Sequence, residues 1–288
     1  RDNTQSYEDK LADDNCGIKL EALCRMDFSD AKVIQAIGRH FSGIHSLRAL
    51  AFYEKAREMG VDADNKIAEL RGALRWSRCC IAIASGDIME IRDVITRDNP
   101  CKDVVDSSSG TTLMHAAAHF GNGRVLDYME SIGYRHDVEN KYGVTPFFFA
   151  CSSTNAVNAV SSIKWFLDRK VDVNAPAKGE EVPPYPIMSV NTLEAYELLL
   201  KNGADLEARS KDGRTAVHYW VSSTYTDVAL LSKVLNKTNT TEKDFAGNSV
   251  LHHVGSALFV RIAVSRGADP NTVDNEGKTP LHKAQNNE

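Results

Sequence analysis

Cysteine and histidine side chains offer this chain its clearest route to covalent chemistry. Cys151 with His115 or His119 could form a thiolate nucleophile and its base, the arrangement that thiol enzymes use. Cys151, however, falls in the alanine-containing first helix of a repeated unit described below, where a small buried residue is expected. We therefore predict that Cys151 is a core residue and that the chain has no catalytic residues.

Two further groups have residue types that bind metal ions. His252 and His253 are adjacent, and adjacent residues on a helix point about 100° apart, so they cannot easily chelate one ion. Asp62, Asp64 and Asn65 carry calcium-type oxygens, but the glycine and closing glutamate of a calcium loop are misplaced, and helix capping explains them better. No GxxxxGK[ST], GxSxG or HExxH pattern occurs. We expect no metal and no cofactor.

The composition is that of an ordinary globular chain. With 42% hydrophobic residues, 25% charged residues and a formal net charge of −5 over 288 residues, it lacks the basic excess of nucleic-acid-binding proteins. No apolar run approaches the ~18 residues of a membrane span. The cysteines form no CxxC pair, which favours small core residues in a reducing compartment. They are Cys16, Cys24, Cys79, Cys80, Cys101 and Cys151.

A six-residue phrase of the form G-x-T-P-L-H recurs along the chain. It is complete at Gly277–His282, and degraded copies begin at Gly110, Gly143, Gly213 and Gly247. Successive leading glycines are 33, 70, 34 and 30 residues apart, and 70 is about two periods of a repeat near 33. Such a period predicts a stack of small similar units, whose ordinary use is to offer a long surface to another macromolecule.

The residue types within each unit predict two short helices followed by a hairpin-like turn. Thr279 would cap the first helix and Pro280 would fit its first position. Leucine and valine at i, i+3 and i+4 spacing follow in the second helix, and a glycine ends it. The phrase histidines would bond to the backbone of the neighbouring turn as structural staples. They are His115, His218, His252 and His282.

These residues resemble the ankyrin repeat, in which the phrase is followed by A-A-x-x-G, a leucine-rich helix and G-A-D-x-N. The match is carried by Ala116–Gly121, Ala195–Leu206 and Arg266–Asn271, and it covers about residues 73–288. The resemblance implies an all-α ankyrin-repeat solenoid of stacked helix-turn-helix units with an N-terminal helical cap region at residues 1–72. The expected units lie near residues 73–105, 106–138, 139–175, 176–208, 209–242 and 243–272, with a partial unit at 273–288.

Two units depart from the pattern. Pro183–Met188 takes the place of the phrase without its turn glycine, and this stretch of chain carries about seven extra residues. We expect the additional length in both Ser152–Ser162 and Ala175–Val182. The first unit, Cys80–Asp87 followed by Glu90–Ile95, has the helices but no phrase.

Residues 1–72 do not follow the repeat. Asp30–His40 and Ser46–Met59 have helical patterns, with Gly60 as the expected C-cap of the second. They would cover the apolar end of the stack, or else form a separate interaction or catalytic domain for which no motif is seen. Because the chain starts with Arg1 and stops midway through a repeat, we expect a piece of a longer protein.

In this architecture the turn tips and first helices line a concave surface, and the residues there are the candidates for partner binding. They are Lys141, Tyr142, Val144, Phe149, Tyr185, Lys211, Asp212, Arg214, Tyr219, Phe245, Asn248 and His253. The aromatic members would form a strip flanked by charges, as binding hot spots do. Alternatively, Phe149 and Trp220 fill an irregular core around the lengthened unit. Further tip candidates are Ser109, Thr111, Asn275, Glu276, Lys278 and Lys283.

The resemblance implies a protein–protein interaction module without catalysis, a scaffold or adaptor. One alternative is a targeting or regulatory segment of a larger enzyme or channel. Another is a secreted bacterial effector acting on a host protein. We expect another protein as the partner, no nucleic acid, no membrane span, a monomer, and a reducing location in the cytoplasm, with the nucleus or a host cytosol as alternatives.

Overall fold

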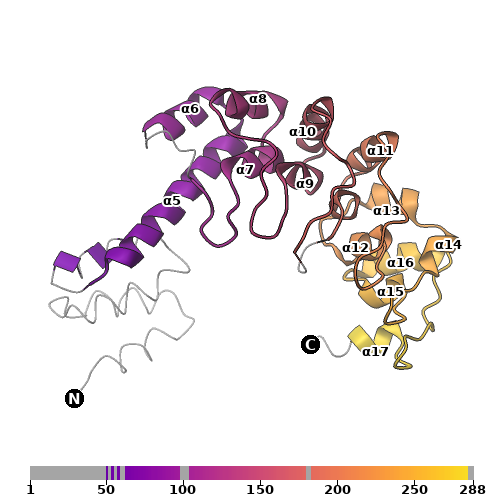
Figure 1. Ribbon diagram of the computed structural model, residues 1–288. Helices are drawn as coiled ribbons and strands as arrows, with labels where there is room; N and C mark the ends of the chain where they lie inside the picture. The colour runs from indigo at the N-terminus through magenta and orange to yellow at the C-terminus, as the bar shows by residue number, and fades with distance from the viewer. Residues whose placement is uncertain are drawn as a thin grey trace, which may run out of the picture. The chain divides into compact units, whose positions relative to one another are not determined.

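The computed structural model describes residues 50, 53–54, 57–58, 62–97, 104–179 and 183–284 (Figure 1). These residues separate into two compact units. One holds the described residues up to Cys79 together with Val104–Ser108, and the other holds the remainder from Cys80 onward. Several predictions for the sequence fall outside the described residues: the helix Asp30–His40, most of Ser46–Met59, and Cys16, Cys24 and Cys101.

Helices and turns make up the described residues, which contain no β-strand. The all-α prediction is therefore confirmed. No helix in this part of the chain is both long and apolar enough to cross a bilayer. The helices are α5 Asp64–Ser85, α6 Ile88–Arg97, α7 Leu113–Phe120, α8 Gly123–Ser131, α9 Pro146–Cys151, α10 Ala156–Asp168, the 3-10 helix η1 Pro186–Ser189, α11 Leu193–Lys201, α12 Ala216–Ser222, α13 Val228–Val234, α14 Lys237–Thr240, α15 Val250–His253, α16 Ala257–Ser265 and α17 Pro280–Ala284.

The described part of the first compact unit is built on the N-terminal portion of α5. Tyr53, Ile67 and Leu70 are buried there. Arg71 Nη2 lies 2.6 Å from Glu54 Oε1 and ties α5 to the preceding helical residues. Asp64 is the first residue of α5, where a carboxylate interacts favourably with the positive end of the helix dipole.

In the second compact unit the helices pair, and the pairs stack on one another (Figure 1). The first helices of successive pairs pack in the order α7, α9, η1, α12, α15 and α17. The second helices pack in the order α8, α10, α11, α13 and α16. At the start of this unit, Gly86 adopts a φ of +72° and turns the chain from α5 into α6, where Ile91 and Ile95 are buried. This is the stack that the repeat predicts.

The phrase histidines connect neighbouring pairs through their rings. The Thr112 N–H donates to His115 Nδ1 at 3.2 Å, and His115 Nε2 lies 3.0 Å from the Val144 carbonyl oxygen of the next pair. Since Nδ1 accepts, the proton sits on Nε2 and is donated to Val144. His252 repeats the arrangement, with its Nε2 3.0 Å from the Lys278 carbonyl oxygen. The prediction of structural staples is confirmed for His115 and His252. It is wrong for His218, whose buried Nε2 has no hydrogen-bond partner among the described residues.

The irregular unit differs from its neighbours in its first helix, and the pair before it differs in its second helix. Its first helix is η1, four residues of 3-10 helix where α7 has eight residues. In the pair before it, α10 has 13 residues where α8 has nine, which provides part of the extra length expected in Ser152–Ser162. The second expected insertion, Ala175–Val182, lies only partly within the described residues. Trp220 of α12 is 2% exposed, and its Nε1–H donates to the Ile187 carbonyl at 3.2 Å. Trp220 is thus a core residue beneath η1.

Candidate functional site

Four tight turns project beyond the first helices, and we call them the fingers: Asn140–Gly143, Ser210–Gly213, Asp244–Gly247 and Asp274–Gly277. Each is closed by a hydrogen bond from the glycine N–H to the carbonyl of its first residue, for example Gly213 to Ser210 at 2.9 Å. The finger glycines adopt positive φ angles between +66° and +81°. Only glycine takes this left-handed conformation at little cost, so the glycine that closes each turn sets the shape of the finger.

Backbone hydrogen bonds join the tip of one finger to the turn before it. The Lys141 N–H donates to Ser109 at 2.9 Å, and the Phe245 N–H donates to Asp212 at 2.8 Å. The Asn275 N–H donates to Ala246 at 3.0 Å. These bonds hold the finger tips at fixed spacing, so side chains at the tips are presented on a rigid backbone.

Two aromatic side chains of the predicted strip are exposed on this backbone. Phe245 is 70% exposed, although its ring lies against Gly213 of the preceding finger. Tyr142 is 39% exposed, and its carbonyl accepts the N–H groups of Lys178 and Gly179 at 3.0 and 2.7 Å. An exposed ring with a fixed backbone loses little entropy on binding, which is how aromatic anchors contribute affinity.

The other aromatic candidates are half-buried. Phe149 packs edge to face on His115, with ring centroids 5.1 Å apart. Tyr185 precedes η1 as its N-cap residue, and Tyr219 points into a groove described below. The strip is therefore divided into two exposed rings on the fingers and three half-buried rings.

The other members of the predicted set differ in how exposed they are. Lys141, Lys211 and Asp212 are exposed at finger tips. Val144 and Asn248 are buried, because both lie where a finger meets the first helix. These two side chains support the fingers, and we leave them out of the surface proposed below.

A buried carboxylate organises the finger that carries Phe245. Asp244 Oδ1 accepts the Asn248 N–H at 2.8 Å, and Oδ2 lies 2.9 Å from His253 Nε2. Arg214 Nε lies 3.8 Å from the same oxygen. Burial would raise the pKa of Asp244, but the hydrogen bonds from Asn248 and His253 together hold it below its usual value. His253, which we predicted to lie on the binding face, thus stabilises the finger through its contact with the buried Asp244 carboxylate.

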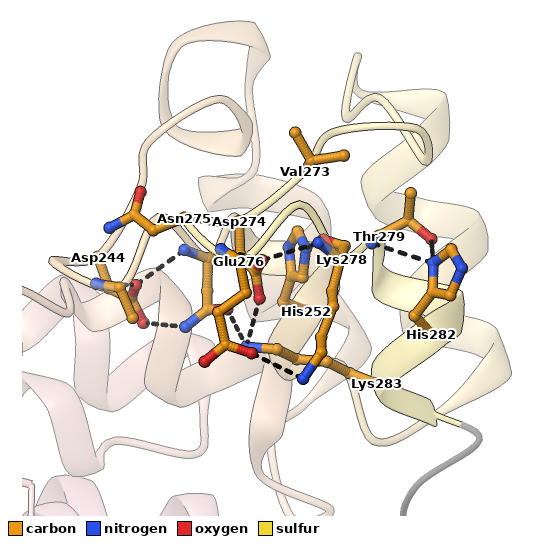
Figure 2. A network of polar contacts seen from close by, with 12 residues as sticks. Asp244, His252, Val273, Asp274, Asn275, Glu276, Lys278, Thr279, His282 and Lys283 are labelled. Atoms are coloured by element: carbon orange, nitrogen blue, oxygen red, sulfur yellow. Dashed lines mark hydrogen bonds and ion pairs between the residues drawn. The ribbon is translucent and has the colours of Figure 1, made fainter.

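The last finger has an equivalent arrangement, shown in Figure 2. Asp274 Oδ1 accepts the Lys278 and Glu276 N–H groups at 2.9 Å each. Lys283 Nζ lies 3.0 Å from Asp274 Oδ2 and also contacts Asn248 Oδ1. The Lys278 N–H, followed by Lys283, lowers the pKa of Asp274 to about 2. The carboxylate therefore stays ionised and joins this finger to its neighbour through Lys283.

A groove opens where η1 replaces a full first helix. It lies between α9, η1 and α12 and has a volume of about 550 Å³. Its apolar lining includes Phe148, Met188, Tyr219 and Trp220. Volumes of this size are common in ligand-binding sites.

Comparison with known proteins connects this architecture to a fold. No family model matches the chain. The human ASB11 ankyrin repeat domain superposes with a TM-score of 0.53 and 17% sequence identity, covering 71% of this chain and 90% of that domain. The chain therefore has the ankyrin-repeat fold.

Curated relatives of this ankyrin-repeat protein match it over different lengths. NF-kappa-B inhibitor zeta of Mus musculus is 25% identical over 259 residues, which cover 84% of this chain and 33% of the relative. Ankyrin repeat protein OPG189 of Variola virus is 30% identical over 92 residues, 31% of this chain and 16% of the viral protein. The chain thus spans about a third of the length of the murine relative that it matches.

The residues that suggested chemistry are held in structural roles in this ankyrin-repeat protein. Cys151 is fully buried, and burial raises the pKa of its thiol, which disfavours the thiolate. His115 has both ring nitrogens engaged in the staple. His252 is a staple and His253 binds Asp244, so the two adjacent rings serve different partners. Among the described residues, no group of three or more His, Cys, Asp or Glu side chains is placed to hold a metal ion.

The sequence did not reveal the groove or the buried Asp244–His253 pair. The groove had a signal, because Pro183–Met188 lacks both the turn glycine and the histidine of the phrase. From that departure we expect extra length, and the structure has a shortened first helix there as well. The pair had no local signal, since His253 reaches Asp244 only after the chain has turned through Gly247 into α15.

Proposed function

We propose that this ankyrin-repeat protein binds another protein through the fingers and first helices, and that it has no catalytic activity of its own. The observation that carries the proposal is Phe245, a 70% exposed ring whose backbone is held by a hydrogen bond to Asp212. Tyr142 provides a second exposed ring on another finger. Rigid exposed aromatics flanked by charged residues such as Lys211 have the character of interface hot spots.

The experiment is quantitative partner capture by the full chain followed by cross-linking mass spectrometry. We expect cross-links from Lys141 and Lys211 to the captured protein. Phe245→Ala with Tyr142→Ala should weaken binding by at least ~2 kcal/mol, about 30-fold, while leaving the melting curve nearly unchanged. Val157→Ala is the matched control, because Val157 is 78% exposed but lies on the second helix α10. Equal binding by the double variant and the control would contradict the proposal.

The name of the murine relative supplies the first partner to try. NF-kappa-B inhibitor zeta is an inhibitor of NF-kappa-B by its name, and the alignment with it covers most of this chain. We propose NF-kappa-B as the first purified protein to test, with the same alanine variants. A single protomer, a reducing intracellular location, and the division into a helical region at residues 1–72 and repeats from 73 onward belong to the same proposal.

A further inference from the structure

We propose that the groove between α9, η1 and α12 receives one uncharged apolar side chain from an extended segment of the partner protein. The inference rests on the proposed function, because it names what part of a partner this face would take. The groove differs from the finger surface in position and chemistry. The fingers present aromatic rings of this chain to the partner, whereas the groove would receive a side chain of the partner.

The groove lies where the first helix of the irregular unit is short. Val190 follows η1 with extended backbone (φ −67°, ψ 140°), whereas α7 is still helical at the equivalent position, Ala117. Asn191 then spans the gap: its Nδ2–H donates to the Ser152 carbonyl at 2.8 Å, and its own carbonyl accepts the Asp227 N–H at 2.7 Å. These two hydrogen bonds fix the extended segment Val190–Asn191, which lines the groove.

The lining selects an uncharged occupant. Among the described residues that line the groove, none is an Asp, Glu, Lys or Arg, and the walls are formed by Phe148, Met188 and Trp220. His119 also lines it, with Nδ1 3.2 Å from the Phe149 carbonyl oxygen. Burial lowers the pKa of His119, so its ring is neutral at pH 7. A charged side chain would lose its hydration here without gaining a countercharge.

Two observations favour a segment of a protein over a free small molecule. Tyr219 lies both in the groove and in the strip predicted for partner binding, so the groove is continuous with the first-helix side of the proposed surface. Tyr225, 72% exposed, stands at the rim, where it can pack on the chain that flanks an inserted side chain.

The test uses a displayed library of random linear 12-residue peptides selected on the full chain. Ser222→Trp fills the groove from its edge, because Ser222 is the exposed last residue of α12 and lines the groove. Ser265→Trp is the matched control: Ser265 is the exposed last residue of α16 and does not line the groove. Both hydroxyls donate to a carbonyl three residues earlier at 2.8 Å, so the two substitutions remove the same local bond.

We expect selected peptides that share one aromatic or branched apolar position, with binding lost at least tenfold in Ser222→Trp and kept in Ser265→Trp. The peptides should also shift the indole N–H resonance of Trp220. Peptides that bind both variants equally, or an enriched motif with a charged anchor, would overturn the inference. So would the finding that N-acetyl-tryptophanamide binds while no peptide does. Capture of a partner that depends on Phe245 but not on Ser222 would leave the proposed function intact and refute the groove alone.

Discussion

The ring of Phe245 lies on Gly213 so closely that a Cβ on the glycine would come within 2.5 Å of ring carbon Cδ1. The glycine thus has two roles, since it also takes a φ of +78°. Side-chain size at one finger therefore controls the position of the exposed ring on the next.

Gly213→Ala should destabilise the protein and displace Phe245. The left-handed backbone alone costs a residue with a Cβ about 1–2 kcal/mol, and the contact with the ring adds to that. Gly277→Ala is the control, because Gly277 has a φ of +76° in the same kind of turn but no atom within 4 Å of the added Cβ. Urea unfolding of both variants measures the difference, and equal losses would show that the ring moves aside at no cost.

Arg169 should be more sensitive to replacement by lysine than an ordinary surface arginine. Its guanidinium carbon lies 3.4 Å from the Trp165 ring centroid, and Nη2 lies 2.6 Å from Glu130 Oε2. Lysine keeps the charge but loses the planar stack and the fork of hydrogen bonds. We expect Arg169→Lys to lower the free energy of unfolding by about 1 kcal/mol.

Arg135 provides the comparison for Arg169. It pairs with Asp137 at 2.8 Å, but both side chains are largely exposed. Exposed pairs contribute little to stability and are screened by salt, so Arg135→Lys should be close to neutral. Equal losses for the two variants in thermal unfolding would contradict a special role for the stack on Trp165.

Stability should fall as the pH is lowered from neutrality. Burial lowers the pKa of His115 and of His218 from 6.5 to about 4. The unfolded chain therefore takes up protons below pH 6.5 before the folded chain does, and stability is lost progressively between pH 6.5 and 4. Each histidine contributes about 3 kcal/mol to this loss at 1.36 kcal/mol per pKa unit. Asp244, whose pKa is lowered in the folded state, adds a loss of the same sign at more acidic pH.

Urea titrations at pH 7, 6, 5 and 4 measure this dependence. His218→Asn removes one titrating ring and should flatten the profile below pH 6.5, whatever it does to stability at pH 7. An unchanged slope in the variant would show that His218 titrates equally in the folded and unfolded chains.

Thr226→Val should stabilise the isolated chain. The Thr226 hydroxyl is buried without a hydrogen-bond partner, an arrangement that costs about 1–3 kcal/mol. Valine has the same shape and removes the penalty, so we expect a gain of about 1 kcal/mol. Thr224→Val in the same loop is exposed and should change little. A loss of stability in Thr226→Val would indicate that the hydroxyl is satisfied by a bound water.

Local patterns predicted the repeated parts of the fold well, because each unit carries its own signals. The phrase places the cap, the first helix and the staple histidine within six residues, as Gly247–His252 shows. Contacts between units were harder to predict. Asn248 and Val144 occupy tip-like positions in the pattern, yet they are buried where a finger meets the first helix. After η1 the chain is likewise held by hydrogen bonds between Asn191 and residues distant in the sequence: Asn191 donates to the Ser152 carbonyl and accepts from the Asp227 N–H. No local pattern records these bonds.

The histidine staples also divide the stack into blocks of different cooperativity. Phe148 and Met188 stand where the phrase has histidine, so neither the pair containing α9 nor the one containing η1 can form the bond that His115 makes. In a chain of nearest-neighbour couplings, unfolding proceeds in segments separated by the weakest couplings. Amide hydrogen exchange should therefore find two zones that open separately, with the boundary at η1. A bound segment in the groove would join the two zones and make them exchange as one.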